Sequence, residues 1–114
     1  MDAGVINRAI FDALEESVGG EFIIVIVDAF LEETSQLMEA LKKSLSTGDA
    51  DAFRRAAHSM KSNAATFGAM QLSEQARELE AMARAEKMSE IGSRLEVLEE
   101  AVRSAIEEIK DLIK

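Results

Sequence analysis

The chain has 114 residues, a formal net charge of −9 and neither cysteine nor proline. This length predicts a single domain, residues 1–114, that can bury a core without disulfide bonds. The negative charge argues against binding to nucleic acid or to an anionic membrane, because both attract basic surfaces. No apolar run approaches the roughly 20 residues of a membrane span. The N-terminus also lacks the pattern of a signal sequence, so we expect a cytoplasmic protein.

Glycines divide the chain into helical segments. Gly19, Gly20, Gly48 and Gly68 each fall where a helical pattern of apolar residues stops. Glycine often follows the end of a helix because it adopts the left-handed backbone conformation without steric cost. Asp49 follows Gly48 and can cap the N-terminus of the next helix.

Two helices are predicted in the first part of the chain, at about residues 5–17 and 21–46. The apolar stripe of the second helix consists of Ile23, Ile26, Val27, Phe30, Leu37, Leu41 and Leu45. The six apolar residues from Phe22 to Val27 are mostly β-branched and could instead form a buried strand. We favour a helix because the helical period continues beyond them, and because no other segment could pair with a lone strand.

Three more helices are predicted at about residues 50–67, 70–84 and 90–113. Gly92 is unfavourable inside a helix by about 1 kcal/mol, so the last helix could begin near Ser93 instead. Four long amphipathic helices with short connections predict an all-α fold. We expect an antiparallel up-down-up-down four-helix bundle, with the short first helix packed across one end.

The only histidine of the chain, His58, lies in the third predicted helix. At 100° per residue, the apolar side chains of that helix gather on one arc. They are Phe53, Ala56, Met60, Ala64 and Phe67. Because His58 falls on the opposite, polar side, the sequence predicts an exposed imidazole.

The residues around His58 at helical spacing are basic or small. They are Arg54, Arg55, Lys61, Ser62 and Ala65. Residues 52–73 include three basic residues and no acidic one, so we expect a locally positive strip on a negative protein. A neutral imidazole can act as a nucleophile, and nearby cations would stabilise an added phosphoryl group. The small side chains of Ser62 and Ala65 would leave the ring accessible to another protein.

Residues 57–69 resemble the signature of histidine-containing phosphotransfer (HPt) domains. That signature has a histidine, a lysine three residues later, a small residue next, and a glycine six residues after the small one. His58, Lys61, Ser62 and Gly68 match it in register. Ser62 stands where glycine is commonest in the family, but serine is still small.

The resemblance implies an exposed, phospho-accepting histidine on the third helix of an up-down-up-down bundle. It implies that His58 exchanges a phosphoryl group with an aspartate of a response-regulator receiver domain, or receives one from a hybrid histidine kinase. Lys61 would stabilise the phosphoryl group, and Gly68 would form the turn into the fourth helix. The magnesium ion belongs to the receiver in this family, so we expect no cofactor and no metal here. The chain would be a phosphoryl carrier and not an enzyme.

A surface for docking the partner is expected on the second helix. The run from Phe22 to Val27 has more apolar side chains than one helical stripe can bury. The first helix could cover some of them, and Phe22 and Val25 are candidates for an exposed patch that contacts the partner. The apolar stripe of the last helix is expected to face the core, which predicts a monomer.

Two other functions remain open at this point. A helical adaptor on the same fold would need no phosphorylation, and His58 would then be incidental. An enzyme is disfavoured because one histidine cannot supply the paired Glu-x-x-His motifs of a di-metal bundle. The scattered glycines also form no phosphate-binding loop. Replacing His58 with glutamine would distinguish an adaptor from a phosphotransfer protein.

Overall fold

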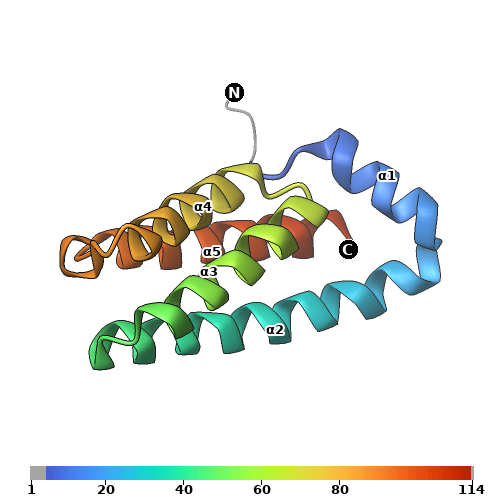
Figure 1. Ribbon diagram of the computed structural model, residues 1–114. Coiled ribbons are helices and arrows are strands. Elements are labelled where there is room, and N and C mark those ends of the chain that lie inside the picture. The colour runs from blue at the N-terminus through green and yellow to red at the C-terminus, as the bar shows by residue number, and fades with distance from the viewer. Residues whose placement is uncertain (1–4, 114) are drawn as a thin grey trace.

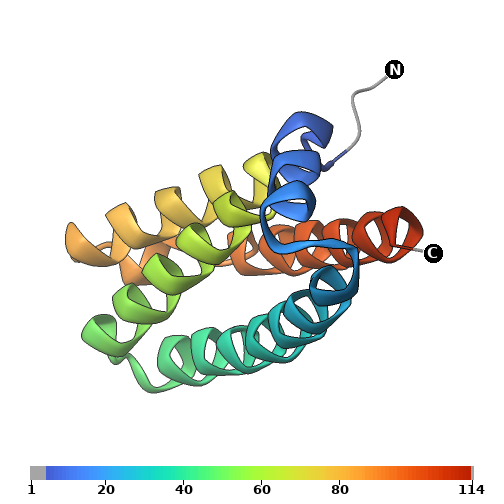
Figure 2. The same cartoon turned by 90° about the vertical axis from the view of Figure 1, so that its right-hand side faces the viewer.

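The computed structural model describes residues 5–113 (Figure 1). Its elements within this range are α1 (Arg8–Val18), α2 (Gly20–Thr47), α3 (Ala50–Thr66), α4 (Met70–Arg84), the short 3₁₀ helix η1 (Met88–Glu90) and α5 (Arg94–Leu112). The four long helices form an antiparallel bundle, and α1 lies at the end where α3 meets α4 (Figures 1 and 2). The predicted all-α bundle with a short first helix is confirmed. None of the helices in residues 5–113 is long and apolar enough to cross a membrane.

The ends of α2 and α3 follow the predicted signals. Gly48 follows α2 in the left-handed conformation, with a φ angle of 75°. The Asp49 side chain then caps α3, accepting a hydrogen bond from the Ala52 N–H at 3.0 Å. The β-branched run near the start of α2 is helical, so the strand alternative is wrong.

The predicted start of α1 is wrong by three residues. The helix begins at Arg8 instead of Val5, because the Asn7 side chain forms the cap. Its Oδ1 atom accepts a hydrogen bond from the Ile10 N–H at 3.2 Å. A side chain of this type satisfies backbone donors that have no partner inside the helix.

The predicted start of the last helix at Glu90 is also wrong. Gly92 adopts a φ angle of 47°, which interrupts the helical path, and α5 begins only at Arg94. The alternative start near Ser93 is the closer prediction. Between α4 and α5, residues Met88–Glu90 form a single 3₁₀ turn.

The core is mostly aliphatic, as expected for a chain with five phenylalanines and no other aromatic residue. The fully buried side chains include Val27, Leu41, Phe53, Met60, Leu72, Leu98 and Ile109. The rings of Phe30 in α2 and Phe67 at the end of α3 lie 4.4 Å apart between centroids. This contact places Phe30 level with the C-terminal end of α3.

The segment before α1 forms hydrogen bonds with two distant parts of the chain. The Asn7 N–H donates to the Gly68 carbonyl at 2.7 Å, at the turn between α3 and α4. The N–H groups of Val5 and Ile6 donate to the Glu108 carboxylate of α5, at 2.8 and 3.3 Å. Gly68 has a φ angle of +82°, and a Cβ atom added there would lie 2.8 Å from the Asn7 carbonyl oxygen. The turn that joins α3 to α4 therefore requires glycine both for its backbone conformation and for this contact.

Candidate functional site

His58 lies near the middle of α3 with its imidazole in solvent. Its side chain is 56% exposed. The adjacent Ala57 and Met60 are fully buried and hold this helix against the core. The predicted exposed histidine is therefore confirmed, on a rigid element whose inner face is packed.

A buried carboxylate on α4, that of Glu80, contacts the histidine ring. The Glu80 side chain is only 6% exposed and has three partners. Its Oε2 atom lies 2.9 Å from His58 Nδ1 and 3.0 Å from the guanidinium of Arg84. Its Oε1 atom lies 2.9 Å from the ammonium of Lys61. One carboxylate thus joins two residues of α3 to one residue of α4.

The charge of Glu80 is stabilised despite its burial. Burial by itself raises the pKa of a carboxyl group, because it disfavours the charged form. Hydrogen bonds from Lys61 and His58 outweigh this effect and hold the pKa of Glu80 below its ordinary value. The group is therefore a carboxylate near neutral pH, and a carboxylate can only accept hydrogen bonds.

The packing of α3 against α4 positions this cluster. The two helices are antiparallel neighbours joined by the tight turn at Gly68 (Figure 1). The buried Ser73 hydroxyl of α4 donates to the Lys61 carbonyl of α3 at 3.0 Å, which fixes their register next to the site. The hairpin thus brings a carboxylate from 22 residues along the chain to the His58 ring.

The expected positive strip is wrong in part. Arg54 and Arg55 both pair with Asp51, at 2.9 and 3.0 Å. Asp51 lies about two helical turns before His58, near the start of α3. Lys61 pairs with Glu80. All three basic residues of segment 52–73 are therefore paired with acidic residues that lie outside it in sequence.

The small residues lie where the sequence placed them. Ser62 is exposed one turn after His58, and Ala65 is partly buried in the following turn. Neither carries a bulky side chain that could cover the ring. Gly68 is buried in the α3–α4 turn, so its contribution is to the hairpin that carries the site.

Phe22 and Val25 are exposed, as predicted, but the structure does not bring them next to His58. Their exposed fractions are 64% and 60%. They precede Phe30 on α2, and the contact between Phe30 and Phe67 shows that they lie beyond the end of α3. Figure 1 shows this part of α2 continuing past the α3–α4 turn toward α1.

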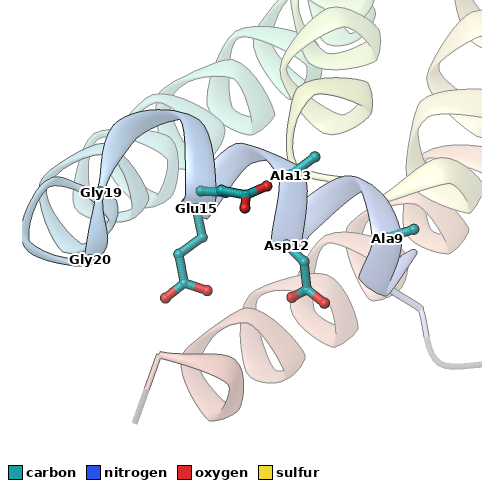
Figure 3. Close-up of a pocket in the computed structure, with 7 residues that line it drawn as sticks. Ala9, Asp12, Ala13, Glu15, Gly19 and Gly20 are labelled. Atoms are coloured by element: carbon teal, nitrogen blue, oxygen red, sulfur yellow. The ribbon is translucent and has the colours of Figure 1, made fainter.

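A hollow of about 650 Å³ lies beside α1 (Figure 3). It is lined by Asp12, Glu15 and Glu16 together with alanines of α1 and the glycines that join α1 to α2. Among residues 5–113, no group of three or more acidic, histidine or cysteine side chains could hold a metal ion. The hollow shares no residue with the cluster around Glu80.

The sequence model of the Hpt domain family matches residues 25–112. This range covers all of α3, α4 and α5 and most of α2. The chain belongs to the Hpt domain family.

Two curated relatives of this Hpt domain carry the name phosphorelay protein LuxU. The protein of Vibrio cholerae serotype O1 is 28% identical over 108 residues, which cover 95% of this chain and 96% of the relative. The protein of Vibrio harveyi is 28% identical over 92 residues, covering 81% of each. Among solved structures, histidine-containing phosphotransfer protein B (HptB) of Pseudomonas aeruginosa PAO1 is similar, with a TM-score of 0.91 and 26% identity. That match covers 98% of this chain and 96% of the solved one.

Glu80 and Arg84 are the residues of this Hpt domain's site that the sequence did not reveal. The two are spaced i, i+4 on a helix, which is a signal for an ion pair. That signal usually marks a solvated surface, and nothing local shows that Glu80 is buried against another helix. The contact with His58 depends on the α3–α4 register, which only the folded hairpin defines.

Proposed function

We propose that this Hpt domain carries a phosphoryl group on His58 and exchanges it with an aspartate of a receiver domain. The observation that carries the proposal is an exposed imidazole whose Nδ1 atom lies 2.9 Å from a buried carboxylate. Membership of the Hpt family supports it, as do the relatives named as phosphorelay proteins. On this proposal the chain is a carrier in a phosphorelay and has no substrate turnover of its own.

The contact with Glu80 supports Nε2 as the ring nitrogen that reacts. Because the Glu80 carboxylate can only accept, the Nδ1 atom of His58 carries the hydrogen and donates it. The lone pair of the neutral ring then lies on Nε2, on the side of the ring away from Glu80. A ring fixed in one tautomer by a carboxylate is oriented for attack, as in other histidine sites.

Phosphoryl transfer then needs few further groups. The Nε2 lone pair forms the new N–P bond while the P–O bond to the donor aspartate breaks, and its electron pair returns to the carboxylate oxygen. The reverse step restores the Nε2 lone pair. Lys61, on the next turn of α3, stabilises the phosphoryl charge, and such transfer depends mostly on positioning and electrostatics. Ser62 and Ala65 leave room for the partner's active site.

The first test is phosphoryl transfer from a panel of phosphorylated receiver domains and hybrid histidine kinases. The wild-type chain and the His58→Gln variant are compared at equal concentration. We expect acid-labile, base-stable label on the wild type alone, with equal melting temperatures for both proteins. Label that persists on the variant would refute His58 as the acceptor. Receiver binding without any label on the wild type would favour the adaptor function instead.

The partner footprint is proposed to extend from His58 toward α1. Val25 lies five residues before Phe30, and His58 lies nine residues before Phe67. Fourteen residues of helix at 1.5 Å each separate their levels by about 21 Å. A standard interface of about 800 Å² per partner is roughly 30 Å across. Such an interface covers both His58 and Val25 only when its centre lies between them, and not when it is centred on His58.

Val25→Asp tests this footprint against a matched control. Val97→Asp places the same charge at another exposed valine, which is 54% exposed on α5. We expect the Val25 variant to bind a receiver domain more weakly, while the Val97 variant binds normally and both keep their helical content. Equal binding by both variants would exclude Phe22 and Val25 from the footprint.

A further inference from the structure

Ser62 has an exposed side chain one helical turn after His58 on α3. Its hydroxyl makes no hydrogen bond to any residue between 5 and 113. The hydroxyls of Ser44 and Thr66 differ, because each donates to the carbonyl four residues earlier in its own helix, at 2.7 and 3.0 Å. The Ser62 hydroxyl is therefore available to a group that arrives from outside the fold.

The helical geometry of α3 places Ser62 on the Nε2 side of the histidine ring. At about 100° per residue, Lys61 lies about 60° from His58 on one side of the helix, and Ser62 lies about 40° from it on the other. Lys61 and His58 Nδ1 both contact Glu80 of α4, each at 2.9 Å, so α4 lies on the Lys61 side. The Nε2 atom faces away from Glu80 and therefore toward the side that carries Ser62.

The spacing of the two residues suits a contact with a phosphoryl group on Nε2. The Cβ atoms of residues four apart on a helix lie about 5–6 Å from each other. Side chains on a helix also lean toward its N-terminal end, so the Ser62 hydroxyl extends over the turn that carries His58. A hydroxyl donates one hydrogen bond, and phosphoryl oxygens are strong acceptors.

The nearby basic side chains of α3 are held by carboxylates. Arg55 lies one turn before His58, also about 60° toward the Nε2 side, but its guanidinium pairs with Asp51 at 3.0 Å. Lys61 is only 29% exposed, and its ammonium is bound to Glu80. Ser62 can donate to a new group without first breaking a contact with another residue of the described range 5–113.

We propose that the Ser62 hydroxyl donates a hydrogen bond to the phosphoryl group carried on His58 Nε2. This bond stabilises the phosphorylated chain and shifts the exchange with a receiver domain toward His58. The inference rests on the proposed function, because it requires a phosphoryl group on Nε2. The competing explanation is a hydroxyl that bonds only to water, so that Ser62 contributes nothing beyond its small size.

The test compares Ser62→Ala, Ser62→Thr and a control, Ser35→Ala. Ser35 is exposed on α2, where it lines a hollow against α5, and it lies outside the His58 cluster. Each protein is equilibrated with one phosphorylated receiver domain, and the ratio of phosphorylated chain to phosphorylated receiver is measured. We expect Ser62→Ala to lower this ratio about fivefold, the size of one net hydrogen bond. Ser62→Thr keeps a hydroxyl and should lie closer to the wild type, and Ser35→Ala should match the wild type.

The outcomes separate this inference from the proposed function. A wild type that accepts no label from any donor refutes both. A labelled wild type with Ser62→Ala within twofold of it refutes the inference and leaves the proposed function intact. Equal losses in Ser62→Ala and Ser35→Ala would also overturn it, since loss of any exposed hydroxyl would then have the same effect. A ratio for Ser62→Thr as low as that of the alanine variant would overturn it as well.

Melting temperatures show that the Ser62 variants are folded. Alanine has a higher helix propensity than serine, so Ser62→Ala should melt at or above the temperature of the wild type. A lowered ratio at an undiminished melting temperature then assigns the loss to the missing hydroxyl. A loss of ratio that follows a loss of stability across the three variants would overturn the inference.

Discussion

Replacing Gly68 with alanine should destabilise the domain more than the same change at Gly48. Both glycines have positive φ angles, +82° and +75°, so alanine is strained in both places. The left-handed conformation costs a non-glycine residue roughly 1–2 kcal/mol. The surroundings differ, because a Cβ at position 48 meets nothing within 4 Å, whereas at position 68 it lies 2.8 Å from a backbone oxygen of Asn7.

The additional cost at Gly68 comes from that contact. The Asn7 backbone cannot move away without lengthening its 2.7 Å hydrogen bond to the Gly68 carbonyl. Overpacking of this kind costs about 1–3 kcal/mol. We therefore expect Gly68→Ala to lose about 2–5 kcal/mol and Gly48→Ala about 1–2 kcal/mol. At about 4 °C per kcal/mol for a domain of this size, the two melting temperatures should differ clearly.

Thermal unfolding followed by circular dichroism measures both variants, and amide hydrogen exchange locates the cause. Gly68→Ala should increase exchange at the Asn7 amide, while Gly48→Ala should leave it protected. Equal losses of stability in the two variants, with the Asn7 amide still protected in both, would refute the reasoning. They would show that the segment before α1 does not constrain the α3–α4 turn.

Three other substitutions follow from the site and the core. Lys61→Ala should slow phosphoryl transfer without abolishing it. The control is Lys42→Ala, which removes a lysine that pairs with Glu99 at 2.7 Å on another face. Equal phosphoryl-transfer rates for the two variants would contradict the role of Lys61. The pKa of Glu80 is lowered in the folded state, so its carboxylate stabilises the fold at pH values above the ordinary carboxyl pKa. This stabilisation is lost as the pH falls through the pKa of Glu80 in the folded protein. Urea unfolding at several pH values should show a weaker acid dependence in Glu80→Gln, and an unchanged dependence would exclude Glu80 as a contributor. Phe67→Ala should lower the free energy of unfolding by about 3–5 kcal/mol, because Phe67 is only 7% exposed and its ring contacts Phe30. A negligible shift in melting temperature would contradict this.

The sequence was informative wherever the physical cause is local. The apolar period located α2, α3 and α4 to within a residue or two, and the polar side of α3 predicted the exposure of His58. Asn7 was a readable cap, and using it would have corrected the start of α1. Asp51 likewise stands at ion-pair spacing from Arg54 and Arg55, so their pairing could have been predicted.

Glu80 could not be found in this way, because its burial has no local cause. An acidic residue within a helix usually faces solvent, and its neighbours along α4 do not distinguish it. The three partners that permit its burial include two on another helix, His58 and Lys61, 22 and 19 residues earlier in the chain. Only the register of the α3–α4 hairpin brings them together.

The Glu80 cluster also bears on how the chain selects a single fold. The inner faces of α3 and α4 are rich in small side chains: Ala56, Ala57, Ala64, Ala76 and Ala83 are all buried. Small side chains let two helices pack closely, and a slip by one helical turn would move one helix past the other by about 5.4 Å. Such a slip would separate the buried Glu80 carboxylate from His58 and Lys61, its two partners on α3, at a cost of several kcal/mol. Glu80 thus contacts the histidine and also favours one register of the α3–α4 hairpin. Loss of Glu80 would weaken the preference for this register as well as remove the contact with His58.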